Sequence, residues 1–159
     1  MHCIDVKILH EINITQERSI LLRMYMNLEG YQWKSKENWI GAGDHCKWEG
    51  VTCGEDETKH EYRVIELSLP DNQLIGDFPA DLNELNVLKK LSITGNSMVK
   101  SIPENLCSRS ASEELQIFGD HANCPNSFDA SIGEYSDSGC CSNVLVDVDT
   151  YLENFARYI

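Results

Sequence analysis

Hydrophobic residues between positions 64 and 118 recur at a fixed spacing. The stretch VIELSLPDNQLIGDFPADLNEL starts at Val64, and the similar stretch LKKLSITGNSMVKSIPENLCS starts 24 residues later, at Leu88. This period predicts a stack of similar coils, because a single coil cannot bury its own apolar side. Residues related by the same step are Leu67, Leu91 and Leu115; Leu69, Ile93 and Ile117; Asn72, Asn96 and Asp120; Pro79 and Pro103; and Leu82 and Leu106.

Each coil is expected to combine one strand with a return segment. Leu67 and Leu69 alternate with polar neighbours, which is typical of a strand with one buried face. Asn72 follows the strand, where a side-chain amide can hydrogen-bond the backbone of neighbouring coils. Gly76 and Pro79 mark the return, because glycine tolerates unusual backbone angles and proline fixes φ. The residues expected to point inward on the return side are Leu74, Phe78, Leu82, Leu85 and Leu88.

An amphipathic helix is predicted ahead of the repeats. Thr15 is a suitable N-cap for the segment ERSILLRMYMNLEG, which would stop at Gly30. A helix here covers the first coil, since an uncovered end of the stack would leave an apolar patch in water. Its apolar face consists of Ile20, Leu21, Met24 and Leu28.

The repeat L-x-x-L-x-L-x-x-N-x-L-x-G-x-x-P resembles the plant-type leucine-rich repeat. Ahead of it, the string Cys46-x-Trp48-x-Gly50-Val51-x-Cys53 is similar to the N-terminal cap of that family. The resemblance implies an α/β fold, a short right-handed solenoid of β-strand and 3-10 coils between a helical N-terminal cap and a cysteine-rich C-terminal cap. It also implies that Cys46 and Cys53 are bridged and that Trp48 packs on the first coil. Closing this small loop contributes roughly 2.5 kcal/mol in the chain-entropy model.

The third coil departs from the repeat. The second coil already has Lys100 where the first has Gly76. The third keeps Leu115, Ile117 and Asp120, but Arg109 and Ser112 occupy positions expected to point inward. We therefore interpret it as a terminal coil, which gives an array of about two and a half coils. The expected organisation is an N-terminal helical cap over 1–63, repeats over 64–123, and a cysteine-rich C-terminal cap and tail over 124–159.

Length and charge restrict the classes of function. The 159 residues suit one domain. The net charge of -13, from 13 Lys and Arg against 26 Asp and Glu, argues against a nucleic-acid partner. No apolar run reaches the ~18 residues of a membrane span. The acidic excess after residue 100 is typical of a solvated face, and the functional alternative is a docking surface for a basic partner.

The cysteines favour an oxidising compartment, because structural disulfides do not persist in a reducing cytosol. Cys140 and Cys141 are adjacent and bridge each other only with backbone strain, so each is expected to pair with Cys107 or Cys124, in either arrangement. Cys3 is left over, as a chain-end residue or as a link to another chain.

The compartment that we predict is extracellular or secretory, with the thylakoid lumen as the alternative. The first residues lack the basic start, apolar stretch and small-residue cleavage site of a signal peptide. This absence indicates either a processed or truncated chain or a protein kept in the cytosol, and the cysteines favour the first. Asn13 begins an N-glycosylation sequon, which supports secretion slightly.

The sequence offers little that indicates catalysis or metal binding. Its five histidines are scattered and accompany no nucleophile motif. His45 beside Cys46 invites a thiol–imidazole interpretation, but Cys46 is expected in a disulfide. Zinc sites favour cysteines two to four residues apart, a spacing that this chain does not offer. The acidic pair Asp147 and Asp149 lacks the glycine and glutamate of a calcium loop. We therefore predict no enzyme activity, no cofactor and no metal.

In the family that the sequence resembles, ligands usually meet the concave strand face. Three strands spaced ~4.8 Å apart form a face only about 10 Å across, too small alone for the ~800 Å² per partner of a standard interface. Additional surface must come from the caps or from a longer protein. The alternative for these positions is that they are only solvated parts of the strands. The candidate residues are Glu66, Ser68, Pro70, Lys90, Ser92, Thr94, Glu114, Gln116 and Phe118.

The function predicted from these observations is non-enzymatic protein binding through the concave face and the caps. One alternative is an accessory subunit of a larger assembly, on the lumenal side of an organelle membrane. Another alternative is an ectodomain fragment of a receptor kinase or a secreted inhibitor of wall-degrading enzymes, because both are common uses of this repeat.

Overall fold

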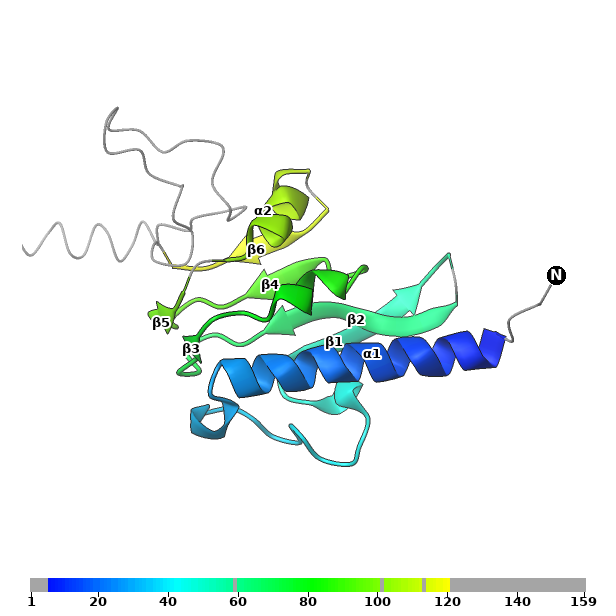
Figure 1. The fold of residues 1–159 in the computed structure, drawn as a ribbon, viewed down its shortest axis with the longest axis horizontal. Coiled ribbons are helices and arrows are strands. Elements are labelled where there is room, and N and C mark those ends of the chain that lie inside the picture. The colour runs from blue at the N-terminus through cyan, green and yellow to red at the C-terminus, as the bar shows by residue number, and fades with distance from the viewer. Residues whose placement is uncertain (1–5, 59, 101, 113, 121–159) are drawn as a thin grey trace, which may run out of the picture.

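A long helix begins the described part of the chain, which in this computed structural model comprises residues 6–58, 60–100, 102–112 and 114–120 (Figure 1). Helix α1 spans Val6–Asn27, so the expected N-cap at Thr15 is wrong. Thr15 lies inside the helix, where its carbonyl accepts a hydrogen bond from Ser19 Oγ at 2.9 Å. The residues ahead of Thr15 include no glycine or proline to stop the helix, which explains its earlier start.

Four strands form the main sheet, in the order β1-β2-β4-β6 (Figure 1). Strands β2, β4 and β6 are parallel, as a stack of coils requires. Strand β1 was not predicted and pairs with β2 in the antiparallel direction. The bounds are Val51–Asp56 for β1, Glu61–Ser68 for β2, Lys90–Ser92 for β4 and Gln116–Phe118 for β6.

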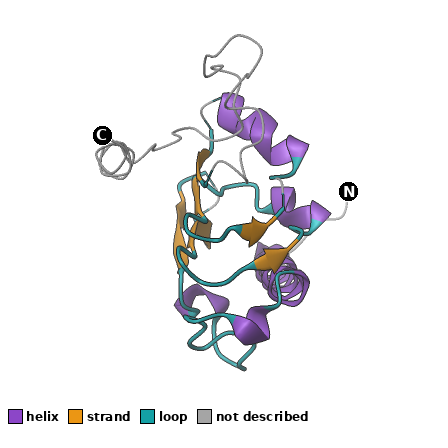
Figure 2. Cartoon of the chain, turned by 90° about the vertical axis from the view of Figure 1, so that its left-hand side faces the viewer, coloured by secondary structure: helices purple, strands orange, loops and turns teal. Residues whose placement is uncertain are grey.

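The return side of the coils carries short strands and helices. Strand β3, Ile75–Gly76, pairs in parallel with β5, Met98–Val99. The 3-10 helix η3 spans Ala80–Glu84 and helix α2 spans Glu104–Ala111. In Figure 2 the strands of the main sheet lie on one side of the molecule and the long helix on the other. Two further 3-10 helices, η1 at Gly30–Gln32 and η2 at His45–Lys47, belong to the segment between α1 and β1.

The register of the sheet corrects the predicted period at its second step. Glu66 lies beside Lys90, 24 residues on, as predicted. Lys90, however, lies beside Gln116, which is 26 residues on, so Leu91 is matched by Ile117 and not by Leu115. The return side of this coil holds the α-helix of eight residues in α2, whereas the previous coil has the five-residue η3. The longer helix accounts for the longer coil.

One buried cluster joins α1 to the coils. The predicted apolar face of α1 is confirmed, since Ile20, Leu21, Met24 and Leu28 are all 0% exposed. Within the described residues, no helix has both the length and the apolar character needed to cross a bilayer. The buried hydrophobic residues contributed by the three parallel strands and their flanks are Val64, Leu67, Leu69, Leu91, Ile93, Leu115 and Ile117.

Two asparagines connect neighbouring coils, as predicted. The Asn96 side-chain amide donates to the carbonyls of Leu69 and Ile93, both at 2.8 Å. Its oxygen accepts from the backbone N–H of Asn72 at 3.0 Å and of Leu74 at 3.1 Å. Asn96 is 1% exposed, so these bonds satisfy backbone groups that water cannot reach.

Asn72 makes the equivalent connection one coil earlier, toward the cap. Its amide donates to the Ser35 carbonyl at 2.8 Å, and its oxygen accepts from the Ser35 N–H at 2.6 Å. Asn72 therefore fastens the first coil to the segment that follows α1.

Gly76 occupies a backbone conformation that glycine alone adopts readily. Its φ is 117°, and a Cβ at this position would lie 2.7 Å from the Asn27 carbonyl oxygen. The expected need for glycine on the return side is therefore met, and the close approach brings β3 against the end of α1.

Candidate binding face and N-terminal cap

The outward side chains of the main sheet form the concave face, which we define as Thr52, Glu66, Ser68, Lys90, Ser92, Gln116 and Phe118. Pairing aligns them in rows across the strands, because Glu66 lies beside Lys90 and Lys90 beside Gln116, while Ser92 lies beside Phe118. Thr52 of β1 lies opposite Glu66 and widens the face by one strand. All seven side chains are at least partly exposed, whereas their strand neighbours Leu67, Leu91 and Ile117 are buried.

Lys90 connects three strands of the concave face. Its Nζ lies 3.3 Å from Glu66 Oε1 and 5.6 Å from the centroid of the Phe118 ring. Both charged side chains are partly exposed, so each contact contributes at most ~1 kcal/mol. The contacts leave the face mixed in sign, with an aromatic ring at one end and hydroxyl groups between.

Three further predicted candidates lie outside the strands. Pro70 and Thr94 follow the ends of β2 and β4, and Glu114 precedes β6 by two residues. Ser92 pairs with Phe118, so the residue that corresponds to Thr94 in the next coil is Asp120 and not Phe118. The Asp120 carboxylate accepts a hydrogen bond from the Gly95 N–H at 2.9 Å.

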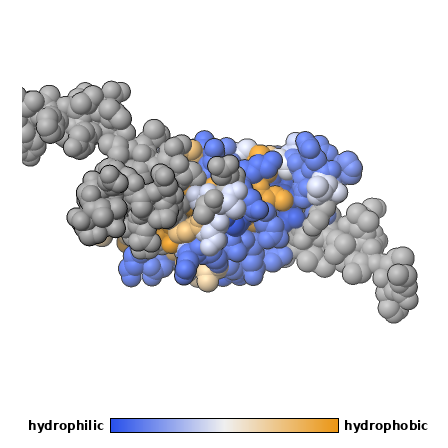
Figure 3. All heavy atoms as spheres, turned by 90° about the horizontal axis from the view of Figure 1, so that it is seen from above, coloured by the Kyte–Doolittle hydropathy of each residue, from blue (hydrophilic) through white to orange (hydrophobic). Residues whose placement is uncertain are grey.

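Hydrophilic side chains dominate the described part of the surface seen from above, with smaller hydrophobic areas between them (Figure 3). Large hydrophobic side chains that are exposed come from separate segments: Met26, Tyr31, Ile40, Tyr62 and Met98.

The N-terminal cap is built around the predicted disulfide and the three tryptophans. Cys46 and Cys53 are bonded, with their Cα atoms 5.4 Å apart. Trp33, Trp39 and Trp48 are 3%, 5% and 2% exposed. Trp39 lies between the other two, at centroid distances of 4.9 and 5.0 Å. The cap is thus a compact aromatic layer, and its three rings belong to the same buried cluster as the leucines of the coils.

Arg18 of α1 fastens the loop that leads into the disulfide. Its guanidinium lies 4.8 Å from the centroid of Trp48 and donates to the carbonyls of Gly41 and Gly43. The Asp44 carboxylate accepts from the Cys46 N–H at 2.9 Å and so caps η2. These contacts place His45 and Cys46 on the side of the loop that faces α1 and β1.

Charged residues buried between α1 and β2 were missed by sequence reasoning. Glu17 is 2% exposed, accepts from Arg63 Nε, and accepts from the Val64 N–H at 2.9 Å. His45 Nε2 lies 3.7 Å from the same carboxylate, and a Glu61 oxygen lies 3.6 Å from Arg63. Burial alone would raise the pKa of Glu17, but hydrogen bonds from His45, Val64 and Arg63 and the Arg63 charge outweigh it and lower that pKa.

One signal in the sequence could have located Glu17. It stands three and four residues before Ile20 and Leu21, so it shares their helix face. A carboxylate on a buried helix face requires a partner, which here comes from a strand 46 residues away.

Arg109 fills a position expected to hold an inward leucine. Its guanidinium donates to the carbonyls of Asn83 at 3.2 Å, Leu85 at 3.1 Å and Leu88 at 3.0 Å. Burial lowers the pKa of Arg109, and the Glu114 charge opposes that change. The arginine therefore satisfies backbone carbonyls of the preceding coil instead of filling its core.

The structure bears on one of the remaining cysteine predictions, and the glycosylation of Asn13 stays a prediction. Cys107 is disulfide-bonded. Cys3, Cys124, Cys140 and Cys141 lie outside the described residues, so the pairing at the C-terminal cap stays a prediction. Asn13 lies within α1.

Comparisons with known proteins agree with this architecture. Residues 14–54 match the family described as leucine rich repeat N-terminal domain. The chain is 37% identical over 59 residues to receptor kinase-like protein Xa21 of Oryza sativa subsp. japonica. The aligned residues cover 37% of this chain and 6% of that protein. It is 29% identical over 103 residues to receptor-like protein 3 of Arabidopsis thaliana, covering 65% of this chain and 13% of that protein. The chain therefore spans a small part of the length of these relatives.

A solved structure has a similar fold over 64% of the chain. The crystal structure of a plant ice-binding protein superposes with a TM-score of 0.50 at 22% identity, covering 64% of this chain and 31% of that one. At this identity the similarity concerns the fold alone. Together with the matched N-terminal domain, the strand register and the Cys46–Cys53 bridge, these findings support the similarity to plant-type leucine-rich repeat proteins.

Proposed function

We propose that the chain is a non-enzymatic protein-binding module that presents its concave face, together with the surface of its caps, to a protein partner. The observation that carries this proposal is the aligned row of polar and aromatic side chains on the face opposite α1, centred on Lys90. Side chains in such rows contact a ligand without any rearrangement of the buried leucines beneath them. The addition of β1 makes the sheet four strands wide, or roughly 14 Å at ~4.8 Å between strands.

A second candidate is favoured by the comparisons. The relatives named above are a receptor kinase-like protein and a receptor-like protein, and the matched segment is a small part of each. The same module then serves as the start of a receptor ectodomain, exposed outside the cell. The Cys46–Cys53 bridge supports an oxidising compartment for either candidate.

Affinity capture with matched charge-reversal variants tests the binding proposal. The full chain is immobilised, exposed to an extract of its source tissue, and any retained protein is cross-linked and mapped. Lys90→Glu reverses a charge on the concave face, and Lys100→Glu reverses one outside it, beside Asp77 at 3.5 Å. We expect Lys90→Glu to abolish retention of the mapped partner and Lys100→Glu to retain it.

The opposite result contradicts the proposal. Equal retention by both variants, or cross-links confined to α1 and η3, would place the interaction on another surface. Secretion of the full-length product into the medium of source cells, measured by immunodetection, tests the compartment; an entirely cytosolic product would refute it.

A further inference from the structure

Strand β1 has one edge without a strand partner in the described part of the chain. It stands first in the sheet order β1-β2-β4-β6 and pairs with β2 on one side only. No backbone hydrogen bond joins Thr52, Cys53, Gly54 or Glu55 to any described element other than β2. An edge of this kind offers its N–H and C=O groups to an extended segment of another protein.

The direction of these backbone groups follows from the pairing with β2. The Val51 N–H points away from β2, since it donates to the Trp48 carbonyl at 2.9 Å, whereas the Ser68 N–H of β2 donates to the Gly50 carbonyl at 2.8 Å. Residues of an antiparallel strand alternate between facing the partner strand and facing away from it. The one irregularity of the pairing adds its extra residue to β2, so the alternation continues along β1.

Two residues of β1 therefore present backbone groups at the open edge. Cys53 and Glu55 direct their N–H and C=O groups away from β2, while Thr52 and Gly54 face β2. Solvent reaches this part of the strand, because Thr52 and Glu55 are exposed and Cys53 and Gly54 are partly exposed.

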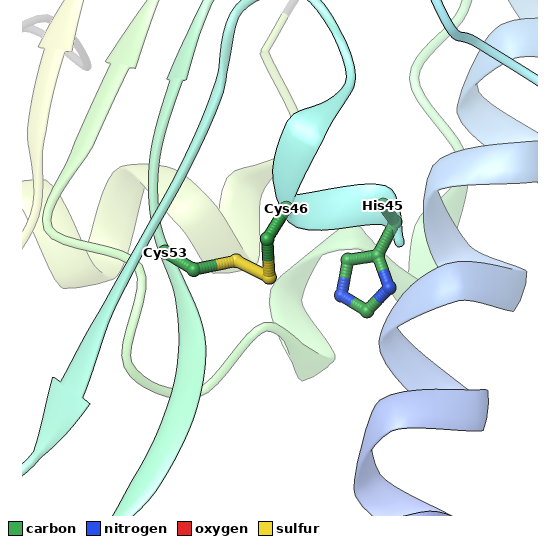
Figure 4. Close-up of side chains that lie close together, drawn as sticks. All are labelled: His45, Cys46 and Cys53. Carbon is green, nitrogen blue, oxygen red and sulfur yellow. A yellow bond between two sulfur atoms is a disulfide. The ribbon is translucent and has the colours of Figure 1, made fainter. Parts of the chain in front are cut away.

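The disulfide holds the edge in its strand conformation. Figure 4 shows the Cys53 side chain reaching toward η2, where its sulfur is bonded to Cys46. The Asp44 carboxylate in turn caps η2 by accepting from the Cys46 N–H. Because the strand is ordered before binding, pairing with it costs a partner less free energy.

Acidic side chains surround the edge. From Glu49 to Tyr62 the sequence has five acidic residues and one lysine. Glu49, Glu55 and Glu57 are exposed. The contact of Glu55 with His60, at 3.4 Å, joins two exposed side chains and is therefore weak.

This charge selects the kind of strand that the edge accepts. Pairing of β1 with a second copy of itself would bring the carboxylates of both chains together, which opposes such a dimer. A strand with lysine or arginine side chains is attracted by the same carboxylates. Strand β1 also contains no proline or lysine, the residues that commonly prevent pairing at an edge.

We propose that the open edge of β1 docks an extended, basic segment of a partner protein, which joins the main sheet as a further strand. The backbone of this segment bonds to the N–H and C=O groups of Cys53 and Glu55, and its basic side chains lie beside the carboxylates of Glu49, Glu55 and Glu57. The docking edge goes beyond the proposed function, because it uses backbone groups of β1 and requires no contact with the concave face.

Binding of a synthetic peptide tests the docking edge. The probe is a peptide of about eight residues, a usual strand length, in which lysine and valine alternate and both ends are blocked. It is titrated into the full oxidised chain, and hydrogen exchange of the backbone amides is followed by NMR. We expect exchange at Cys53 and Glu55 to slow at least about tenfold at saturation, while Thr52 and Gly54, already bonded to β2, change little. Unchanged exchange at Cys53 and Glu55 overturns the proposal.

Two control peptides separate backbone pairing from charge attraction. One carries N-methyl groups on all its central residues, so it keeps its charge and loses its backbone donors. The other has glutamate in place of lysine. We expect each to bind at least about tenfold more weakly than the probe. Equal binding by either control overturns the proposal, since an acidic chain attracts a basic peptide without any pairing.

Variants of Glu55 locate the contact. Glu55→Pro removes an N–H that faces the edge and leaves the bonds between β1 and β2 in place. Glu55→Gln keeps that N–H and removes the charge, and Glu84→Gln removes an exposed charge on η3. We expect the loss of peptide affinity to be largest for Glu55→Pro, smaller for Glu55→Gln and absent for Glu84→Gln. Circular dichroism checks the fold of each variant; if Glu55→Pro does not fold, equal affinity of Glu55→Lys and wild type overturns the proposal.

A variant of the concave face distinguishes this test from that of the proposed function. Lys90→Met changes the concave face and should leave peptide binding unchanged. A peptide that is weakened by Lys90→Met and not by Glu55→Pro binds the concave face, and the docking edge is then wrong. The capture experiment with Lys90→Glu is independent of this result, so either proposal can fail without the other.

Discussion

Replacing Arg63 by methionine removes the cation from a carboxylate that is buried between α1 and β2. The side chains of Arg63 and Glu17 are 5% and 3% exposed, so solvent screens their interaction very little. Removing one partner of such a pair typically costs about 3–5 kcal/mol, because the other charge stays buried. The free energy of unfolding at pH 7 should fall by that amount in Arg63→Met, as measured by urea denaturation of the oxidised chain with tryptophan fluorescence.

The pH dependence of this loss provides a second measurement. In the wild type the pKa of Glu17 is below its ordinary value of 4.5, so its contribution to stability is present above that value and is lost as the pH falls through the lowered pKa. Without Arg63, one hydrogen bond and one charge that lower the pKa of Glu17 are lost while its burial remains, so this pKa rises and protonation relieves the buried charge. The difference between wild type and Arg63→Met should therefore shrink as the pH falls from 7 toward 4.

Two further variants make the test specific. Arg23→Met removes an arginine whose side chain is 50% exposed and pairs with Asp81, so it should cost at most ~1 kcal/mol. The double variant Glu17→Gln with Arg63→Met should lose less than the two single losses added together, since it leaves no unpaired Glu17 carboxylate. A loss below ~1 kcal/mol for Arg63→Met at pH 7, or one that does not change with pH, would refute the reasoning.

Three other substitutions test the connections between coils. Asn96→Ala leaves buried carbonyl and N–H groups without partners and should lower the free energy of unfolding by about 2–4 kcal/mol, more than Asn72→Ala, in urea titrations. Arg109→Met should lower the free energy of unfolding by about 1–3 kcal/mol and increase amide hydrogen exchange in the preceding coil, because the Leu85 and Leu88 carbonyls lose their donor. Unchanged stability and exchange would contradict this role of Arg109. Gly76→Ala should lower the free energy of unfolding by about 1–3 kcal/mol, measured by thermal or urea unfolding, because Gly76 has a φ of 117°. Gly43→Ala is the control and should be neutral, since a Cβ at Gly43 would have no atom within 4 Å. Equal effects of the two substitutions would be inconsistent with strain at Gly76.

Features that depend on local or strictly periodic signals could be predicted from the sequence. The apolar face of α1, the Asn72 and Asn96 connections and the first 24-residue step all follow from spacing and side-chain type. The Cys46–Cys53 bridge followed from the resemblance and is confirmed.

Features that depend on tertiary pairing could not be predicted. Strand β1 contains Gly54, Glu55 and Asp56, which have little preference for strands, and it forms because β2 supplies the partner. The step of 26 residues between Lys90 and Gln116 depends on the α-helix on the return side, which a comparison of repeat positions does not detect.

The predicted positions Glu66, Ser68, Lys90 and Ser92 lie on β2 and β4, whereas Pro70 and Thr94 follow these strands, and the register of the third strand is shifted by two residues. The seven side chains of the concave face include Thr52, which the prediction lacked because β1 was not expected. Whether a ligand uses these positions depends on a partner, and no pattern within one chain identifies that partner.

The opposite direction of β1 gives the repeat array a polarity. Strands β2, β4 and β6 run the same way, and a further parallel coil can pair beside any of them, but the edge next to β2 is already taken by β1. A duplicated coil can therefore be inserted between two of the parallel strands, and it cannot be added outside β1 without changing the type of strand pairing. Repeat duplication, in evolution or by engineering, can therefore lengthen this protein only on the β2 side of β1, and the disulfide-bonded cap stays at one end of the array.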